Sequence, residues 1–389
     1  IGSVGRILIN ELNGVDTTTN TVGAGLTNNL IGAWAVVDRE FASYIPTLGV
    51  GRLNQTGFAG YSINTLLGTP LATDNIRATA GFGPLVVDTT VNTFAMINPT
   101  AAQTTIDLGG KKLTLRGGGL LLTHANDVSN RNITIANGTV TSGLENSDSD
   151  LYVHVITHSG GVNRTFEMNA AVADNGTGKV RLVISGSDGN ANLTLNGANT
   201  YTGGTVVNGG VLIIGSTGSI VGGGITLEGG YNSGSGILVQ QLGGVIASSN
   251  TVTLNGTGLL VLAGEQTLHG LVFNCSGGGT TVPTVTSSEG LLTIGAGGIV
   301  SNPFNPANAA LLTGRVDLGT SANSVTVNTY DFAGFVNFAP TTPGLIMGGL
   351  VGSSGGFTKN GDGVLQINQS LFTGALTVAA GNVQSGAFN

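Results

Sequence analysis

Residues 193–216 read LTLNGANTYTGGTVVNGGVLIIGS, and this stretch decides the fold class. Apolar side chains stand two positions apart in short runs, at Leu193 and Leu195 and again at Leu212 and Ile214. Asn-Gly or Gly-Gly pairs separate the runs, which predicts short strands joined by tight turns. Each strand then has one apolar face and one face of Thr, Asn and other short polar residues. Such a segment can bury its apolar face only against a similar segment stacked on it.

A diverged copy of this stretch follows at residues 365–386, LQINQSLFTGALTVAAGNVQSG. With one residue deleted, Tyr201 aligns with Phe372 and Val207 with Val378, which indicates an internal repeat. We expect the apolar positions of both copies to point into a dry interior between stacked coils. These positions are Leu193, Leu195, Tyr201, Val207, Leu212, Ile214, Leu365, Ile367, Phe372, Val378 and Val383.

Both copies resemble the autotransporter-associated β-strand repeat of bacterial surface proteins, whose usual wording is close to GTLTLSGANTYTGGTTVNGGTL. Residues 355–363, GGFTKNGDG, are also similar to the family's GGLTKxGxG opening, so the second repeat region covers residues 355–386. In that copy Ala375 and Leu376 replace the Gly-Thr pair of the family. The resemblance implies a β-solenoid passenger that is secreted across the outer membrane of a Gram-negative bacterium and lies outside the cell or at its surface.

The composition agrees with a stacked all-β chain. The 389 residues include 67 glycines with no Gly-X-Y period, and 40% of the residues are apolar, which argues against both collagen and disorder. Only 8% are charged, against about 25% in ordinary soluble domains. The surface must therefore consist largely of Thr, Ser, Asn and Gly.

Residues 1–95 hold the single Trp and a dense set of aromatic residues, and we expect them to form an N-terminal β segment. In GAWAVVDREFASY (32–44) the pattern predicts a strand at 33–37, a turn at 38–40 and a second strand at 41–44. The same run is similar to GGWAxVxGxxFAxY of large autotransporter-like proteins. We interpret the aromatic cluster as a cap that closes one end of the solenoid, or as its first coils.

Residues 96–389 continue as strands of three to five residues, punctuated by glycine-rich corners about every 20–25 residues. Sandwiches and barrels also use short strands, but they favour hairpins with two-residue connections. The all-β pattern therefore predicts a right-handed parallel β-helix, that is, a β-solenoid.

The densest group of candidate ligands is Asp148, Asp150, His154 and His158, which alternate along one predicted strand. Carboxylates and imidazoles on one line suggest a divalent metal site or an acid-base pair. Asp150 and His154 would nevertheless be about 13 Å apart, too far to share one ion. We expect these side chains to be exposed, with no catalytic or metal-binding role and no cofactor.

The sequence has no pattern typical of nucleic-acid binding or of a membrane-spanning helix. The 13 basic residues form no stripe that would bind nucleic acid by counterion release. The interspersed Thr, Asn and Gly exclude a membrane-spanning helix, which needs about 20 predominantly apolar residues.

We therefore expect an extracellular structural protein, a stalk, fibre or surface coat, rather than an enzyme. Because the edge coils of a solenoid leave backbone groups unpaired, we expect self-assembly into filaments. An adhesin that binds glycan or a partner cell surface is the main alternative, and a polysaccharide-active enzyme is the third.

Overall fold

The computed structural model describes residues 7–12, 15–16, 26, 30–46, 48–97, 99, 103–124, 132–157, 164–186, 191–229, 236–275, 282–303, 309–329 and 342–386. These residues form strands and no helix, so the described chain contains no helix that could cross a bilayer. Contacts divide the chain into unit 1, residues 1–183, and unit 2, residues 184–389. Each unit contains parallel coils, and the predicted β-solenoid is confirmed.

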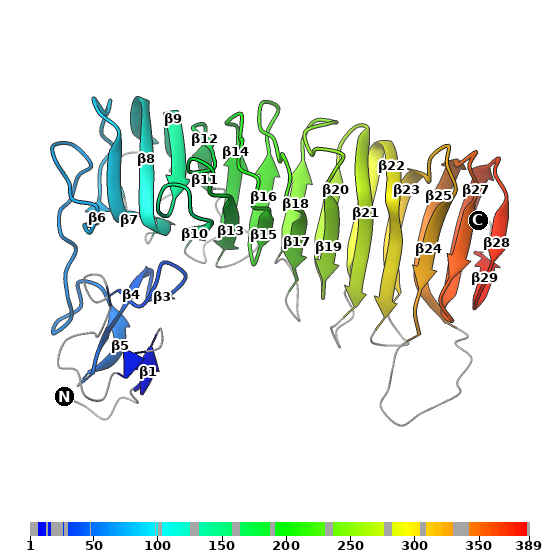
Figure 1. Cartoon of the computed structure of the whole chain (residues 1–389), viewed down its shortest axis with the longest axis horizontal. Coiled ribbons are helices and arrows are strands. Elements are labelled where there is room, and N and C mark those ends of the chain that lie inside the picture. The colour runs from blue at the N-terminus through cyan, green and yellow to red at the C-terminus, as the bar shows by residue number, and fades with distance from the viewer. Residues whose placement is uncertain are drawn as a thin grey trace. The chain divides into compact units, whose positions relative to one another are not determined.

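Unit 1 begins with antiparallel strands and continues as parallel coils (Figure 1). The antiparallel strands are β1 (Glu11–Leu12), β2 (Val15–Asp16), β3 (Val36–Val37), β4 (Glu40–Ile45) and β5 (Gly49–Arg52). The parallel strands are β6 (Asn75–Ala78), β7 (Thr89–Ile97), β8 (Gln103–Thr123), β9 (Asn132–Ser142), β10 (Ser149–Ile156), β11 (Arg164–Met168), β12 (Ala171–Val172) and the start of β13 (Val180–Gly186). Parallel pairing starts at β6, so the coils begin before residue 95.

Strand β8 shows how one coil is built, because its 21 residues line three faces in succession. Its first and middle parts pair with β9, and its last part pairs with β7 and β10. At the first corner Gly109 and Gly110 adopt φ values of 58° and 78°, a conformation that side chains rarely tolerate. The glycines let the chain bend while pairing resumes on both sides, so the prediction of strands limited to three to five residues was wrong.

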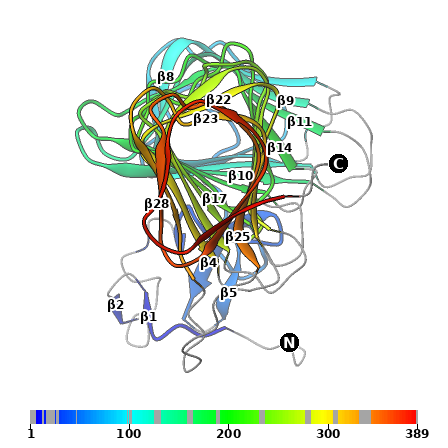
Figure 2. The same ribbon diagram turned by 90° about the vertical axis from the view of Figure 1, so that its right-hand side faces the viewer.

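Unit 2 holds the end of β13 and the strands β14 to β29, whose coils lie one behind another in Figure 2. The strands are β14 (Ala191–Leu195), β15 (Thr205–Val207), β16 (Val211–Ile214), β17 (Ile225–Glu228), β18 (Ile237–Gln240), β19 (Thr251–Asn255), β20 (Leu259–Leu262), β21 (Gln266–Cys275), β22 (Thr284–Pro303), β23 (Ala310–Asp317), β24 (Asn323–Val327), β25 (Pro343–Gly352), β26 (Phe357–Asn360), β27 (Val364–Phe372), β28 (Leu376–Val378) and β29 (Asn382–Ser385).

The core of unit 2 is a column of aliphatic side chains, each placed above its partner in the previous coil. Leu193 pairs with Leu212, which is 19 residues away, and Leu212 pairs with Leu238, which is 26 residues away. The column continues through Leu260, Val285, Leu312, Met347 and Ile367, and all of its members are buried. The length of a coil therefore varies more widely than the predicted range of 20–25 residues. The loops at the corners differ in length, whereas the register of the column is kept.

A ladder of outward-facing amide side chains lies next to this column, at the end of a neighbouring face of the coils. Asn255, Asn274, Asn302 and Asn328 each donate a side-chain hydrogen bond to the residue one coil earlier, over 2.7–2.8 Å. The ladder starts on the carboxylate of Glu228. Repeated amide pairing fixes the register on the polar side, as stacked apolar side chains do on the inner side.

The two repeats occupy equivalent places in their coils, but their burial differs. The first repeat spans β14, β15 and β16, and its expected interior residues are all fully buried: Leu193, Leu195, Tyr201, Val207, Leu212 and Ile214. The second repeat spans β27, β28 and β29, and there Leu365 and Ile367 are buried. Phe372 and Val383 are only half-buried and Val378 is 48% exposed, so the expected burial of these three side chains was wrong. The reason is that no described strand stacks on β28 and β29 from the other side. Val378 and Val383 nevertheless keep interior register positions, paired with the buried Lys359 and Leu365.

Replacement of Leu195 by Asp tests the stacking of the first repeat. Leu195 lies directly beneath Ile214 and is fully buried, so an aspartate there would place an unpaired carboxylate in the core. We expect a loss of about 4 kcal/mol in unfolding free energy. Thr194→Asp is the control, because Thr194 faces outward on the same strand. Equal urea midpoints for the two variants would contradict the assignment.

Candidate functional site

The predicted line of ligands lies on β10 and the turn before it. Asp148 is exposed, as expected, whereas Asp150 is half-buried rather than exposed, and Tyr152 and His154 continue the outward side of the strand. His158 lies outside the described residues. Leu151, Val153 and Val155 point into the core and are fully buried, so the predicted division of the strand into two faces agrees with its burial pattern.

Asp150 is held by a side chain of the next coil. Arg181 donates to both carboxylate oxygens, from Nε over 2.7 Å and from Nη2 over 2.8 Å, and the Tyr152 hydroxyl donates over 2.8 Å. Partial burial alone would raise the pKa of Asp150, but these bonds outweigh it and hold the pKa below its usual value. Burial and the bond to Asp150 raise the pKa of Tyr152 to about 12. The carboxylate is thus fully engaged between two coils.

His154 is not exposed, and that expectation was wrong. Only 5% of its surface is accessible, and its Nε2 lies 2.7 Å from the carbonyl oxygen of Ala33. The ring of Phe41 meets it edge-on at 6.2 Å, and the ring of Tyr152 stacks on it at 6.5 Å. Burial lowers the pKa of His154, although the Ala33 carbonyl opposes this. The covering segment lies more than a hundred residues earlier, which no local pattern around His154 reveals.

That covering segment is the predicted hairpin of residues 33–44, although its first strand covers only residues 36–37 and its turn only 38–39. Val36 pairs with Phe41 and Val37 with Glu40, which leaves Asp38 and Arg39 as a two-residue turn. Both turn residues have positive φ, 46° and 65°, as a type I′ hairpin requires. Strand β5 then adds a third antiparallel strand to the hairpin.

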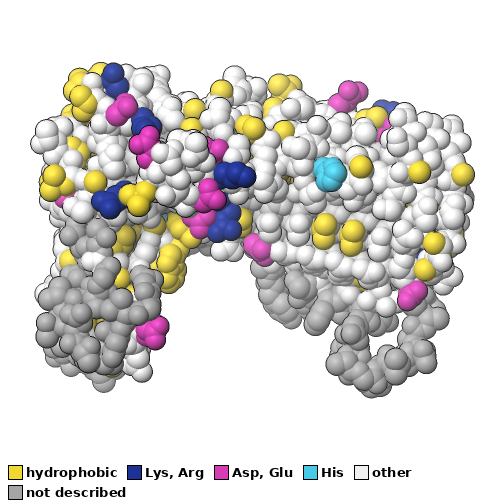
Figure 3. Space-filling view, in the orientation of Figure 1, with side chains coloured by type: hydrophobic (Ala, Val, Ile, Leu, Met, Phe, Trp, Pro, Cys, Tyr) yellow, Lys and Arg dark blue, Asp and Glu magenta, His cyan; other side chains and the backbone are white. Residues whose placement is uncertain are grey.

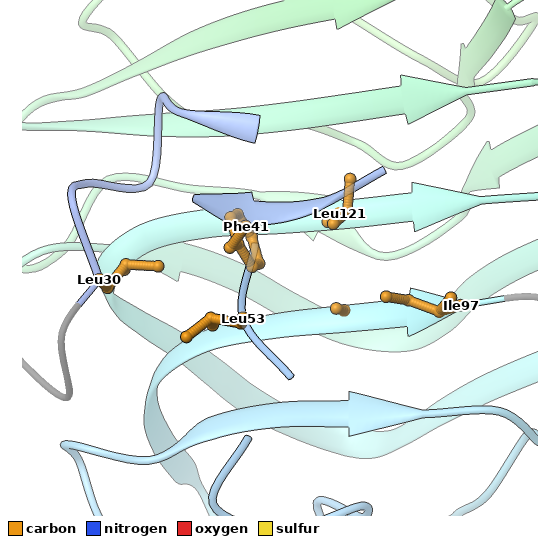
Figure 4. Close-up of a cluster of buried hydrophobic side chains, with 6 residues drawn as sticks. Leu30, Phe41, Leu53, Ile97 and Leu121 are labelled. Atoms are coloured by element: carbon orange, nitrogen blue, oxygen red, sulfur yellow. The ribbon is translucent and has the colours of Figure 1, made fainter. Parts of the chain in front are cut away.

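The hairpin packs on the outward side of consecutive coils of unit 1 and not on their end, so the cap interpretation was wrong. Leu30, Phe41 and Leu53 come from the N-terminal segment and form one buried cluster with Ala95, Ile97 and Leu121 of β7 and β8 (Figure 4). A Cβ atom on Gly119 would lie 2.9 Å from Phe41 Cζ, too close for any side chain. The absence of a side chain at Gly119 therefore admits the Phe41 ring.

An ion pair anchors the edge of the same interface. Glu40 is nearly buried and accepts hydrogen bonds from Arg77 Nε of β6 over 3.1 Å and from the Tyr61 hydroxyl over 2.5 Å. Burial raises the pKa of Tyr61, and the Glu40 charge adds to the shift. The Asp38 and Arg52 pair at 2.9 Å is largely solvated and contributes little. Apolar contact and one desolvated ion pair thus hold the hairpin in place.

The arrangement around β10 therefore serves to join segments of the chain. Among the described residues, no group of three or more His, Cys, Asp or Glu side chains is placed to hold a metal ion. Asp150 is directed to Arg181, whereas His154 is directed to the hairpin. The two side chains have separate partners, and the line predicted from the strand alternation does not converge on one ligand.

Sequence reasoning assigned no role to Lys359, which lies in the opening of the second repeat. Its side chain is fully buried and takes the interior position between Val325 and Val378. Its Nζ donates to the carbonyl oxygens of Asn360, Gly361 and Ala380 over 2.9, 2.7 and 3.1 Å. Burial lowers the pKa of Lys359, although the Asp362 carboxylate opposes this. One ammonium group thus joins the corner at 360–361 to the coil that follows.

The repeats also differ in one matched pair of residues. The Tyr201 hydroxyl is buried and lies 2.7 Å from the Thr205 hydroxyl. In the second copy Phe372 and Leu376 occupy the aligned positions, and Phe372 packs edge-on against Phe357 at 5.7 Å. A polar pair has been replaced by an apolar one, so neither copy leaves a buried hydroxyl without a partner.

The docking of the hairpin should depend on pH through His154. Its folded pKa is lowered below the ordinary 6.5, so the stability it provides is complete above about pH 6.5. That stability is lost as the pH falls through 6.5 toward the folded pKa. We expect the fluorescence of Trp34, next to Ala33, to report release of the hairpin as the pH falls below about 6.5. His154→Gln should abolish this change and His269→Gln should not; an unchanged profile in His154→Gln would contradict the assignment.

Replacement of Lys359 by Met tests the buried ammonium. Methionine fills a similar volume but leaves three carbonyl groups without their donor, at a cost of about 1–3 kcal/mol for each buried group left unpaired. We expect a loss of at least about 2 kcal/mol and early proteolysis within residues 357–386. Thr358→Met is the control, because Thr358 faces outward. Equal protease resistance of the two variants would exclude the anchoring role.

Comparison with known proteins identifies the repeats. The model of the passenger-associated-transport-repeat matches residues 188–214 and 357–384. No curated protein and no solved structure matches the chain. The matched segments overlap most of the two repeats described above and include Tyr201 and Lys359. The repeat is typical of autotransporter passengers, which in general terms are secreted or exposed at the surface.

The chain therefore carries two passenger-associated-transport-repeats, each built into a coil of a parallel β-solenoid, as in an autotransporter passenger repeat protein.

Proposed function

We propose that the chain is a structural part of an extracellular surface protein, a β-solenoid stalk or fibre with no enzymatic activity. The proposal rests on how the side chains of the repeat residues pack. Their apolar side chains stack on register partners in neighbouring coils, as Leu193 stacks on Leu212 and Leu365 on Val383. Repeats that act in this way extend a rod, because each coil is stabilised by its neighbours.

Polar residues of the first repeat serve the same purpose. The Asn199 side chain donates to the carbonyl of Ser219 over 3.0 Å, and the Ser219 hydroxyl donates to the carbonyl of Asn199 over 3.1 Å. Thr217 donates to the carbonyl of Asn196 over 2.6 Å. These contacts join one coil to the next.

We propose further that the chain self-associates through its last described coil. Leu376 and Val378 occupy interior positions there but are 36% and 48% exposed. On their open side β28 and β29 pair with no described strand, so their backbone groups there can pair with another coil. On the face that Figure 3 shows, charged side chains are sparse over unit 2, so electrostatic repulsion between copies is weak. The occupant is a second copy of the chain, which would lead to a filament if the contact does not close.

Analytical ultracentrifugation tests self-association. We expect the sedimentation coefficient to rise with protein concentration, and a Leu376→Lys/Val378→Lys variant to remain monomeric because the contact would bury the lysines without partners. Val221→Lys/Leu242→Lys is the matched control, since both of its sites are exposed apolar residues of unit 2. A monomer at all concentrations would remove the filament proposal and leave the stalk proposal standing.

A further inference from the structure

A hollow of about 600 Å³ opens on the outward side of β23, β25 and β27. These three are neighbouring strands of unit 2 (Figure 1). Glycines form its floor. A Cβ atom on Gly348 would lie 3.2 Å from Thr313 Cα, and one on Gly349 would lie 2.9 Å from the carbonyl oxygen of Gly314. The close approach of these coils excludes a side chain at Gly349 and leaves little room for one at Gly348, and the space above both glycines is open.

The sides of the hollow carry amide groups. Gln366, Asn368 and Gln369 line it from β27. Gln366 donates to Asn368 Oδ1 over 2.6 Å, and Gln384 donates to Gln366 Oε1 over 2.9 Å. This chain of hydrogen bonds orients the amides and leaves the Asn368 amino group without a described acceptor. Oriented amides that retain donors are suited to the hydroxyl groups of a sugar.

Arg315 supplies a positive charge at the same place. Unit 2 contains two basic residues, Arg315 and Lys359, and Lys359 is buried against carbonyl groups. Arg315 is exposed, lines the hollow and forms no ion pair with a described acidic side chain. Its partner Gly349 in the next coil has no side chain that could cover the guanidinium. A planar guanidinium binds a carboxylate through two parallel hydrogen bonds.

An apolar strip borders the amides. Leu311 pairs with Ile346, which pairs with Gln366, and both aliphatic side chains face outward and remain half-exposed. The C–H face of a pyranose ring packs on such a surface. Three strands span two inter-strand spacings, about 10 Å, which fits a short saccharide segment lying across the coils.

The surrounding charge argues for a specific site. Unit 2 holds seven acidic residues against two basic ones, so its general field repels anions. At physiological salt this field is screened beyond about 8 Å, and an anion would be held only where a local cation and donors converge. Arg315 and the amide row meet that condition.

We propose that the hollow binds an acidic saccharide. The carboxylate of a uronic acid pairs with Arg315, its hydroxyl groups bond to Asn368, Gln366 and Gln369, and its C–H face lies on Ile346. This goes beyond the structural role, because a rod needs none of these side chains on its outer side, and the failure of either proposal leaves the other intact.

Isothermal titration calorimetry of the full chain with sodium oligogalacturonate, in the presence of EDTA, tests the proposal. We expect saturable binding, and little or none to a neutral maltooligosaccharide of the same length. Arg315→Gln should weaken binding about ten- to a hundredfold, as expected for loss of a charge-assisted pair. Asn368→Ala should weaken it by a smaller factor, and Arg315→Lys should recover only part of the affinity.

Lys179→Gln provides the matched control, because it removes one exposed positive charge in unit 1. It should bind oligogalacturonate as the wild type does, and unchanged melting curves should show that all variants fold. The proposal is overturned if the wild type shows no saturable binding, if the neutral oligomer binds equally well, or if the two charge-removing variants lose affinity equally. Equal affinity for a sulfated oligosaccharide would overturn the assignment of a carboxylate ligand.

Discussion

The structure depends on one constraint, which is that a single coil cannot bury its own apolar side. Each interior side chain is covered by the equivalent side chain of the coil before it and the coil after it. The column that begins with Leu193 and Leu212 shows this, since each member is buried only because its neighbours in the stack are present. Stability is then a sum over neighbouring coils, and every position where the stack is interrupted needs separate treatment.

The positions where the stack of coils is interrupted are stabilised in different ways. In unit 1 the outward side of β7, β8 and β10 carries apolar residues such as Ala95 and Leu121, and the N-terminal hairpin covers them through Phe41. In unit 2 the ammonium group of Lys359 is buried and donates hydrogen bonds to carbonyl groups of its own coil and of the next coil, which is the last one described. Beyond it Val378 is left partly exposed. These arrangements follow from incomplete stacking, whereas the interior of each coil needs only aliphatic side chains.

The outward side is free of this constraint and can carry chemistry. The amide ladder from Asn255 to Asn328 shows that polar residues there can be ordered over several coils without affecting the core. The hollow beside Arg315 arises in the same way, from glycines that the close stacking requires and from side chains of adjoining coils. A solenoid can thus acquire a binding surface by changing outward residues alone, because inward and outward positions alternate along each strand.

The sequence by itself determined the fold class, the repeats and the hairpin of residues 33–44, because all three depend on local alternation and on turn residues such as Asn-Gly. It also identified which residues of the first repeat are interior, for the same reason. Only the tertiary structure decided which residues are covered: a distant segment buries His154, and Val378 is partly exposed in an interior position because no described coil stacks on it. The role of Lys359 and the hollow beside Arg315 could likewise not be predicted from the sequence. Strand alternation specifies whether a side chain faces inward or outward, but not which side chains of the neighbouring coil lie next to it.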